Sequence, residues 1–362
     1  MSGPQPPRTL LLVADGSASD AIAPLLAQRA WLAANDVRLL VHAYAEVTGG
    51  GLPALPPDTA VVLGFPHAFW DSRVEGILSG PYGTADYAQA LRTHLLDAEA
   101  ALDEAVAGQP RYLNSPRAIA RTRDKAEAQR TLRRAGVPVP SLLDDPRPDD
   151  VLRELASGTT LYVKAVCGSM GKGMAHLAPG RWQTNYHYDG YRLLAPPPPA
   201  GAEGDWERRE QWLFQDVPVG DHRFLERLCL TPGFLFERGI GGPGDGSERT
   251  EFRITVAGGT VAAADERRAP AQALTTRRAE GGASRPSDPH HPAAGAAAEA
   301  ALAAAEALHL GYAVFDVVTD ADGAPYVVDT TAFPATGSAA RLWRRLLDLL
   351  VVRPLADARP VL

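Results

Sequence analysis

Two aspartates near the C-terminus have the spacing of a shared metal site. Two apolar runs flank Asp322-Gly323, a dipeptide that favours a two-residue type I′ hairpin turn. With that turn, Asp316 pairs directly with Asp329, and Thr331 lies on the same face. Paired residues have Cβ atoms about 5 Å apart, so two half-buried carboxylates repel each other unless a cation lies between them. Such oxygen ligands suit Mg²⁺ that also binds phosphate, and a solvated hairpin face with two ordinary aspartates is the alternative.

A glycine-rich stretch, "LYVKAVCGSMGKGM", follows a short apolar run and carries Lys164 and Lys172. Bare glycine N–H groups can approach phosphate oxygens closely. The stretch does not have the spacing or the final hydroxyl of a Walker loop, and it does not complete the dinucleotide-binding fingerprint. The residues therefore predict a flexible hairpin tip with a buried lysine before it, or an ordinary hairpin with a snorkelling lysine.

The elements around these stretches change character along the chain. Apolar runs at 9–14, 37–44 and 59–66 alternate with helical patterns, including one at 87–106, and predict a small Rossmann-like α/β unit. The remaining two thirds are rich in strand patterns with a few helices, one of which starts near Arg123 and stops at Gly136. That part predicts an α+β arrangement.

Composition excludes several classes of protein. The chain has 362 residues, enough for two or three subdomains, with 45% hydrophobic and 22% charged residues. The net charge is −7, without a basic tract for nucleic acid, and no apolar stretch approaches the roughly 20 residues of a membrane span. Cys167 and Cys229 are too few for a disulfide framework. We expect a cytoplasmic protein that binds neither nucleic acid nor membrane.

A lysine before a glycine loop, followed by a carboxylate hairpin, resembles the ATP-grasp superfamily, with a fold like that of glutathione-synthetase-type ligases. The resemblance covers about Asn114 to Gly337. It implies an α/β Rossmann-like pre-ATP-grasp domain at 1–113, followed by an α+β ATP-grasp fold in two subdomains. The first, 114–241, contains a lid loop at 167–174 and a proline-rich insert at 179–205. The second, 242–362, contains the metal hairpin at 312–334.

The resemblance also implies ATP and Mg²⁺, with Mn²⁺ as a substitute, and assigns residues to them. The phosphates, the adenine, the ribose and the metal each have their own set. These sets are Lys125, Lys164, Gly168, Ser169, Gly171, Lys172 and Gly173 for the phosphates, Glu237, Arg238 and Ile240 for the adenine, Glu251 for the ribose, and Asp316, Asp329 and Thr331 for the metal.

The sequence departs from the family pattern at the metal hairpin. Asp329-Thr330-Thr331 stands where the family has Glu-x-Asn, so one Mg²⁺ between Asp316 and Asp329 is the expectation. A second strand, "QWLFQDV", is an alternative candidate for binding the adenine. Several arginines are candidates for holding an acyl phosphate. These are Arg267, Arg268, Arg277 and Arg278, while His67, Asp71 and Arg73, after the third strand, are the candidates for substrate binding.

The implied reaction joins a carboxylate to an amine through an acyl phosphate, giving an amide, ADP and phosphate. Its partners would be a small-molecule carboxylate and amine, or a peptide, and a homodimer is common in the family. Two other functions stay open: a phosphotransferase on the same fold, and a nucleotide-binding protein whose altered metal hairpin has lost catalysis.

Overall fold

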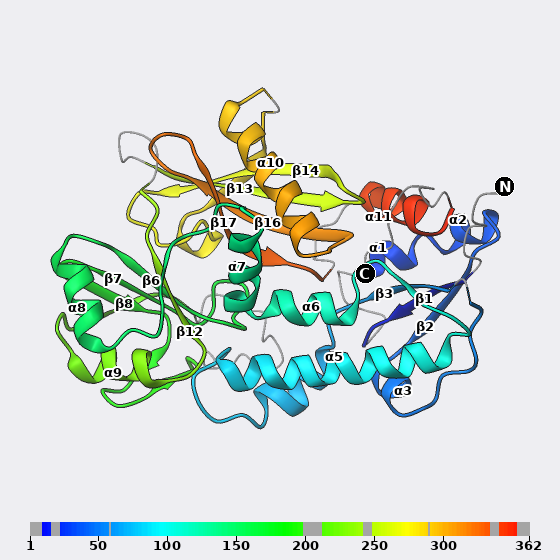
Figure 1. Cartoon of the computed structure of the whole chain (residues 1–362), viewed down its shortest axis with the longest axis horizontal. Helices are drawn as coiled ribbons and strands as arrows, with labels where there is room; N and C mark the ends of the chain where they lie inside the picture. The colour runs from blue at the N-terminus through cyan, green and yellow to red at the C-terminus, as the bar shows by residue number, and fades with distance from the viewer. Residues whose placement is uncertain are drawn as a thin grey trace.

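The computed structural model describes residues 9–15, 22–57, 59–197, 212–241, 248–288, 290–333 and 340–352. Within these ranges the chain forms a parallel sheet, two larger antiparallel sheets and a small two-stranded sheet (Figure 1). Residues 198–205 of the predicted insert and Pro334 of the predicted metal hairpin lie outside the described residues. The chain is therefore a mixed α/β protein.

The first sheet is parallel, with strand order β2-β1-β3-β4. Strands β1 and β3 are buried along their whole length, as expected for parallel strands covered on both faces. The helix predicted between the first two strands is divided into two short ones, α1 and α2. The bounds are β1 Thr9–Val13, α1 Ala23–Leu26, α2 Arg29–Ala34, β2 Arg38–His42, α3 Tyr44–Thr48, β3 Thr59–Leu63, α4 His67–Phe69, the π-helix η1 Trp70–Glu75, α5 Ala85–Ala105 and β4 Arg111–Tyr112.

The second sheet is antiparallel, with order β11-β8-β7-β6-β12-β5. Along β6, Leu161 and Val163 are fully buried, while Tyr162 and Lys164 alternate with them on the opposite face. Helices α8 and α9 lie beside this sheet in Figure 1. The bounds are β5 Leu142–Leu143, α8 Pro148–Ala156, β6 Leu161–Ala165, β7 Met174–Ala178, β8 Arg181–Thr184, β11 Gln215–Val217, α9 His222–Leu230 and β12 Phe234–Arg238, with the small sheet formed by β9 His187–Tyr188 and β10 Leu193–Leu194.

The third sheet is also antiparallel, with order β15-β14-β13-β16-β17. The alanine-rich helix α10 packs against β13, β16 and β17, because its small side chains allow close approach to the strands. One face of the sheet is thereby covered, and charged side chains line the other. The bounds are β13 Glu248–Ala257, β14 Thr260–Pro270, the 3₁₀ helix η3 Arg278–Glu280, β15 Ala283–Pro286, α10 Pro292–Ala307, β16 Tyr312–Thr319 and β17 Pro325–Thr331.

Two short helices, α6 (Pro116–Arg123) and α7 (Lys125–Arg134), connect the first sheet to the other two. The Asn114 side chain before them donates to the carbonyls of Tyr312 and Ala332 at 2.7 and 2.6 Å, which fixes α6 to the third sheet. Asp124 caps α7 by accepting the Glu127 N–H, and Lys125 is therefore the first residue of the helix.

The C-terminal helix α11 (Ala340–Leu347) and the π-helix η4 (Asp348–Val352) return to the first sheet. Trp343 and Leu346 are buried in one cluster with Leu10 and Leu12 of β1. None of the helices in the described ranges is long and apolar enough to cross a membrane.

Candidate functional site

The two aspartates of the C-terminal hairpin pair directly, as predicted: Asp316 on β16 lies opposite Asp329 on β17. The predicted type I′ turn is wrong. The Gly323 N–H donates to the Asp320 carbonyl at 3.0 Å, and of residues 320–324 only Gly323 has a positive φ, of 82°, whereas type I′ needs two such residues. The loop has one residue more than predicted, and a register shift between Asp316 and Val317 restores the pairing.

Two arginines hold Asp316. Arg253 Nη1 lies 3.0 and 3.2 Å from the two carboxylate oxygens, and Arg267 Nη1 lies 3.8 Å from Asp316. The same Arg267 nitrogen is 3.3 Å from Glu251. Arg253 and Glu251 are two residues apart on β13 and therefore share a face. The metal carboxylate predicted at 316 is thus balanced by guanidinium groups.

Glu251 lies on β13, beside Asp316. Burial and the Asp316 carboxylate raise the pKa of Glu251 to about 7, against the opposing influence of Arg267. The Thr276 hydroxyl donates to Glu251 at 3.0 Å. The contact of Glu251 with a ribose stays a prediction.

Lys125 connects α7 to both predicted functional segments. Its ammonium forms an ion pair with Asp329, and its backbone N–H donates to the Val166 carbonyl at 2.9 Å, directly before the glycine loop. Burial raises the pKa of Asp329, but Lys125 and the more distant Lys164 outweigh this, and the pKa lies below its usual 3.8. Asp329 is therefore ionised at neutral pH.

Lys164 lies between the second and third sheets. Its ammonium is 2.5 Å from Glu237 on β12 and 3.2 Å from the Val328 carbonyl on β17. Glu237 also accepts from Gln129 of α7 at 2.5 Å. Burial lowers the pKa of Lys164, but the Glu237 carboxylate raises it above its usual value, so the lysine keeps its charge.

Arg238 lies apart from Glu237, and its predicted contact with an adenine stays a prediction. Arg238 follows Glu237 on β12, so its side chain points to the opposite face, where it binds Glu154 of α8 at 2.6 and 2.9 Å. It does not join Glu237. Ile240 is half-buried after the end of the strand, and its contact with an adenine stays a prediction.

These side chains form one charged cluster between the second and third sheets. The cluster contains two of the predicted phosphate lysines, both predicted metal carboxylates, two glutamates and two arginines. We define it as Lys125, Lys164, Glu237, Glu251, Arg253, Arg267, Asp316 and Asp329.

The two ends of the glycine loop, residues 167–174, pack against neighbouring segments, whereas Met170 at its tip is exposed. The flexibility of the tip stays a prediction. The Cys167 N–H donates to the Gly83 carbonyl at 2.7 Å. A Cβ on Gly173 would lie 2.6 Å from the Tyr186 hydroxyl, and Gly173 has a φ of 73°. Glycine is needed here for this close packing and for its backbone conformation.

Two polar residues of the loop contact aromatic rings. Lys172 is 6% exposed, and its ammonium lies 5.6 Å from the ring centre of Tyr82 and 6.0 Å from that of Trp212. Ser169 Oγ lies 3.3 Å from the Tyr82 hydroxyl. Phosphate binding by Gly168, Ser169, Gly171, Lys172 and Gly173 stays a prediction.

The four candidate arginines occupy different places. Arg267 belongs to the charged cluster, whereas Arg268, the next residue on β14, lies on the opposite face and pairs with Glu266 at 2.6 Å. Which of the four would hold an acyl phosphate stays a prediction. Arg277 donates to the Trp212 carbonyl at 2.9 Å and lies against the glycine loop. Arg278 is exposed at the start of η3.

The predicted substrate residues follow β3 on two short helices. Burial raises the pKa of Asp71, while the charges of His67 and of Lys172 in the glycine loop lower it. Arg73 is exposed on η1. Substrate binding by the three stays a prediction.

The oxygen donors of the hairpin fit a Mg²⁺ ion bound together with a nucleotide. No group of three or more His, Cys, Asp or Glu side chains in the described ranges could hold a metal by itself. Asp316 and Asp329 supply two carboxylates, which is what proteins commonly contribute when phosphates and water complete the shell. Thr331 lies opposite Val314, two residues beyond Asp329, and its ligand role stays a prediction.

Sequence reasoning missed residues that act across strands or helices. Arg253 holds Asp316, Gln129 holds Glu237, and Arg249 of β13 donates to the Tyr162 hydroxyl at 2.7 Å. The alternation of Arg249, Glu251 and Arg253 along one strand was the available signal for two of them. Gln129 gave no such signal, because its partner lies 108 residues away.

No protein-family model matches the chain, and no curated protein is similar to it in sequence. Solved structures do match. The ATP-grasp ligase PsnB, complexed with a minimal precursor, Mg and ADP, aligns with a TM-score of 0.52 and 16% identity over 96% of this chain and 98% of that one.

Two further structures align as well. D-cycloserine synthetase DcsG has a TM-score of 0.55 and 15% identity over 94% of this chain and 98% of that one. The macrocyclase MdnC from Microcystis aeruginosa MRC, bound with precursor peptide MdnA, has a TM-score of 0.55 and 12% identity over 94% and 98%. With the antiparallel sheets on either side of the charged cluster, these matches show that the chain has the ATP-grasp fold.

Proposed function

We propose that the protein is an ATP-dependent ligase that joins a carboxylate to an amine through an acyl phosphate, releasing ADP and phosphate. The observation that carries this proposal is the charged cluster. Lys125, Lys164 and the pair Asp316–Asp329 come from three distant segments of the chain and meet between two sheets. Phosphoryl transfer needs such cations and metal ligands around one group.

The neighbours support a ligase on amino-acid or peptide substrates. PsnB and MdnC are described with bound precursors, and DcsG is a synthetase of a small molecule. We propose either a small carboxylate and amine or a peptide as the substrates here, in the biosynthesis of a specialised metabolite. Mg²⁺ between Asp316 and Asp329 would balance charge on the phosphate oxygens, and Mn²⁺ has the same preference for oxygen donors.

The chain's own residues have distinct parts in this proposal. Lys125 and Lys164 would exchange their carboxylate partners for phosphate oxygens. Arg267 would hold the transferred group, because a guanidinium can bind two oxygens at once. The glycine loop would exclude water, since an exposed acyl phosphate hydrolyses. The amine would then attack the acyl carbon and release phosphate.

The proposed domain division follows the three sheets. Residues 1–113 would be a Rossmann-like pre-ATP-grasp domain, with the ATP-grasp subdomains at 114–241 and 242–362. The parallel order of the first sheet supports the first assignment. A homodimer and a cytoplasmic location remain predictions.

The test is phosphate release from Mg·ATP with amino acids and short peptides, singly and in pairs. We expect one pair to stimulate release and to give a product with the summed mass less water. Arg267→Gln should abolish the stimulation, and Arg268→Gln, on the opposite face of the same strand, should preserve it. A single substrate that gains a stable phosphate would establish a phosphotransferase instead. ATP binding without turnover for every combination would contradict the ligase.

A further inference from the structure

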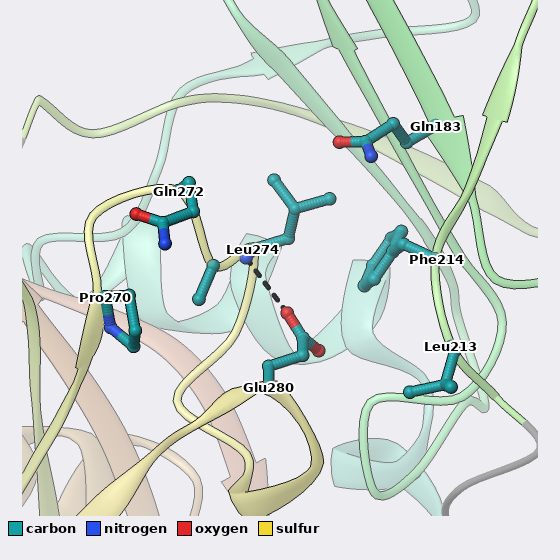
Figure 2. A pocket seen from close by; sticks show the side chains of 8 residues that line it. Gln183, Leu213, Phe214, Pro270, Gln272, Leu274 and Glu280 are labelled. Carbon is teal, nitrogen blue, oxygen red and sulfur yellow. Dashed lines mark hydrogen bonds between the residues drawn. The ribbon is translucent and has the colours of Figure 1, made fainter.

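A pocket of about 300 Å³ lies where β8, the segment before β11 and the loop after β14 meet (Figure 2). This volume is at the small end of ligand sites, which span about 300–1,000 Å³, and suits a single amino-acid residue. Its walls are mainly apolar, with three polar side chains. The lining residues are Gln183, Leu213, Phe214, Pro270, Gln272, Ala273, Leu274 and Glu280.

The pocket offers no free charge. The Glu280 carboxylate accepts from the backbone N–H groups of Leu274 and Thr275 at 2.9 and 3.0 Å, and it pairs with Arg277 at 2.8 Å. Figure 2 shows the first of these bonds, from the Leu274 N–H to the Glu280 carboxylate. A charged ligand group would lose water there without gaining an opposite charge. The occupant should therefore be neutral.

Gln183 supplies a hydrogen-bond acceptor that the protein itself does not use. It is 6% exposed, and among the described residues its Oε1 atom has no hydrogen-bond partner. A buried acceptor without a partner is unfavourable by about 1–3 kcal/mol. Figure 2 places this amide across the pocket from Glu280. The oxygen as placed has less than 1 Å² of exposed surface, so a ligand N–H or O–H would satisfy it once the amide turns about its terminal bond.

The pocket is next to the glycine loop but separate from the proposed adenine site. Arg277 binds the carbonyl of Trp212, which precedes Leu213 of the pocket wall, and lies against Gly171. Glu237, Tyr162, His176 and Gln183 lie in one row across four adjacent strands. Strands are about 4.8 Å apart, so Gln183 is about 14 Å from Glu237.

We propose that this pocket binds a neutral, apolar side chain of the amino-acid or peptide substrate, with a substrate N–H donated to Gln183. The inference rests on the proposed function, because it takes the occupant to be the molecule that is ligated. It adds that the residue bound beside the glycine loop is uncharged. Leu213, Phe214 and Leu274 would contact the side chain, and Gln183 would orient the backbone.

Disulfide trapping tests the proposal, because it detects weak binding at one position. Ala273→Cys places a thiol in the pocket wall, and Leu230→Cys places one on α9, at a residue that is 75% exposed. Each variant is equilibrated with disulfides of cysteamine that carry an N-acetyl-leucyl, N-acetyl-aspartyl, N-acetyl-lysyl or adenine group. The solution also contains 2-mercaptoethanol, which keeps the disulfide exchange reversible. Intact mass measures each adduct, and the parent protein gives the background from its native cysteines.

We expect Ala273→Cys to retain the leucyl group at least fivefold over the others and Leu230→Cys to retain all four alike. Adding Leu274→Trp, which fills the pocket, should remove the preference, and Gln183→Leu should reduce it. Equal retention at both sites, or preference for a charged or adenine group, would overturn the proposal. If the preference holds while the protein neither binds Mg·ATP nor forms ADP, the pocket stands and the ligase function fails.

Discussion

The carboxylate hairpin and the glycine loop are positioned in different ways. Asp316 and Asp329 face each other through ordinary strand pairing within 20 residues of sequence. The glycine loop packs against residues far along the chain, including Gly83 before it and Arg277 after it. The hairpin shows that local strand pairing can bring two carboxylates together. The loop shows that a glycine can be required by close packing against distant segments.

Lys125 is the residue that joins the two regions. Its ammonium pairs with Asp329 of the hairpin, and its N–H binds Val166 before the loop. Substitutions in either region, or at Lys125, therefore test how each region is held in place.

The largest effect is expected in the hairpin at Asp316. Asp316→Asn keeps the shape but removes the charge that a metal would need, so ADP formation should fall about 10²–10³-fold, as when other transition-state charge stabilisers are removed. Steady-state ADP formation with the stimulating substrate pair measures this. Activity within tenfold of the wild type would show that Asp316 is no metal ligand.

Next is the pH dependence from Glu251. Its pKa is raised from 4.5 to about 7 in the folded protein, so the folded state binds more protons than the unfolded state between these values. Stability contributed by protonated Glu251 is complete below pH 4.5 and is lost as the pH rises through 7, by about 3 kcal/mol in all. Glu251→Gln should remove this slope, and thermal unfolding from pH 5 to 8 would measure it. If the stability of both proteins changed equally with pH, the raised pKa of Glu251 would be contradicted.

The glycine loop should respond to Gly173→Ala. Gly136, with a φ of 77° and nothing within 4 Å of an added Cβ, is the matched control. Gly136→Ala should lower stability by about 1–2 kcal/mol through backbone strain alone. Gly173→Ala should lower it by about 1–3 kcal/mol more, because the methyl group meets the Tyr186 hydroxyl. Equal melting temperatures for the two variants would show that the loop is free of its neighbours.

The smallest expected effect concerns metal binding at the junction. Lys125→Met frees Asp329, so Mn²⁺ without nucleotide should bind about five- to tenfold more tightly, a change of about 1 kcal/mol. Lys164→Met removes the same charge from beside Glu237 and should change the affinity less. Electron paramagnetic resonance of free Mn²⁺ measures both. An equal increase in Mn²⁺ affinity in the two variants would indicate a general effect of removing a positive charge, and not the release of Asp329 from Lys125.

Much of the site could be predicted because it depends on local pattern. Alternation along β6 and β16 places Lys164 and Asp316. The Asp316–Asp329 pairing was predicted correctly although the loop has one residue more than predicted, because a register shift between Asp316 and Val317 compensates for it. The same alternation separates Arg267 from Arg268 and Glu237 from Arg238, which the sequence analysis grouped together. This separation needed only the strand assignments.

Local sequence pattern was enough to predict several strands, the hairpin and the candidates for phosphate and metal binding, because these depend on neighbours within a few residues. The packing of distant segments brings Lys125 to Asp329, Gln129 to Glu237 and Arg277 to the glycine loop. Such contacts join segments as much as 204 residues apart. They depend on how three sheets pack together, and no spacing along the chain encodes that packing directly.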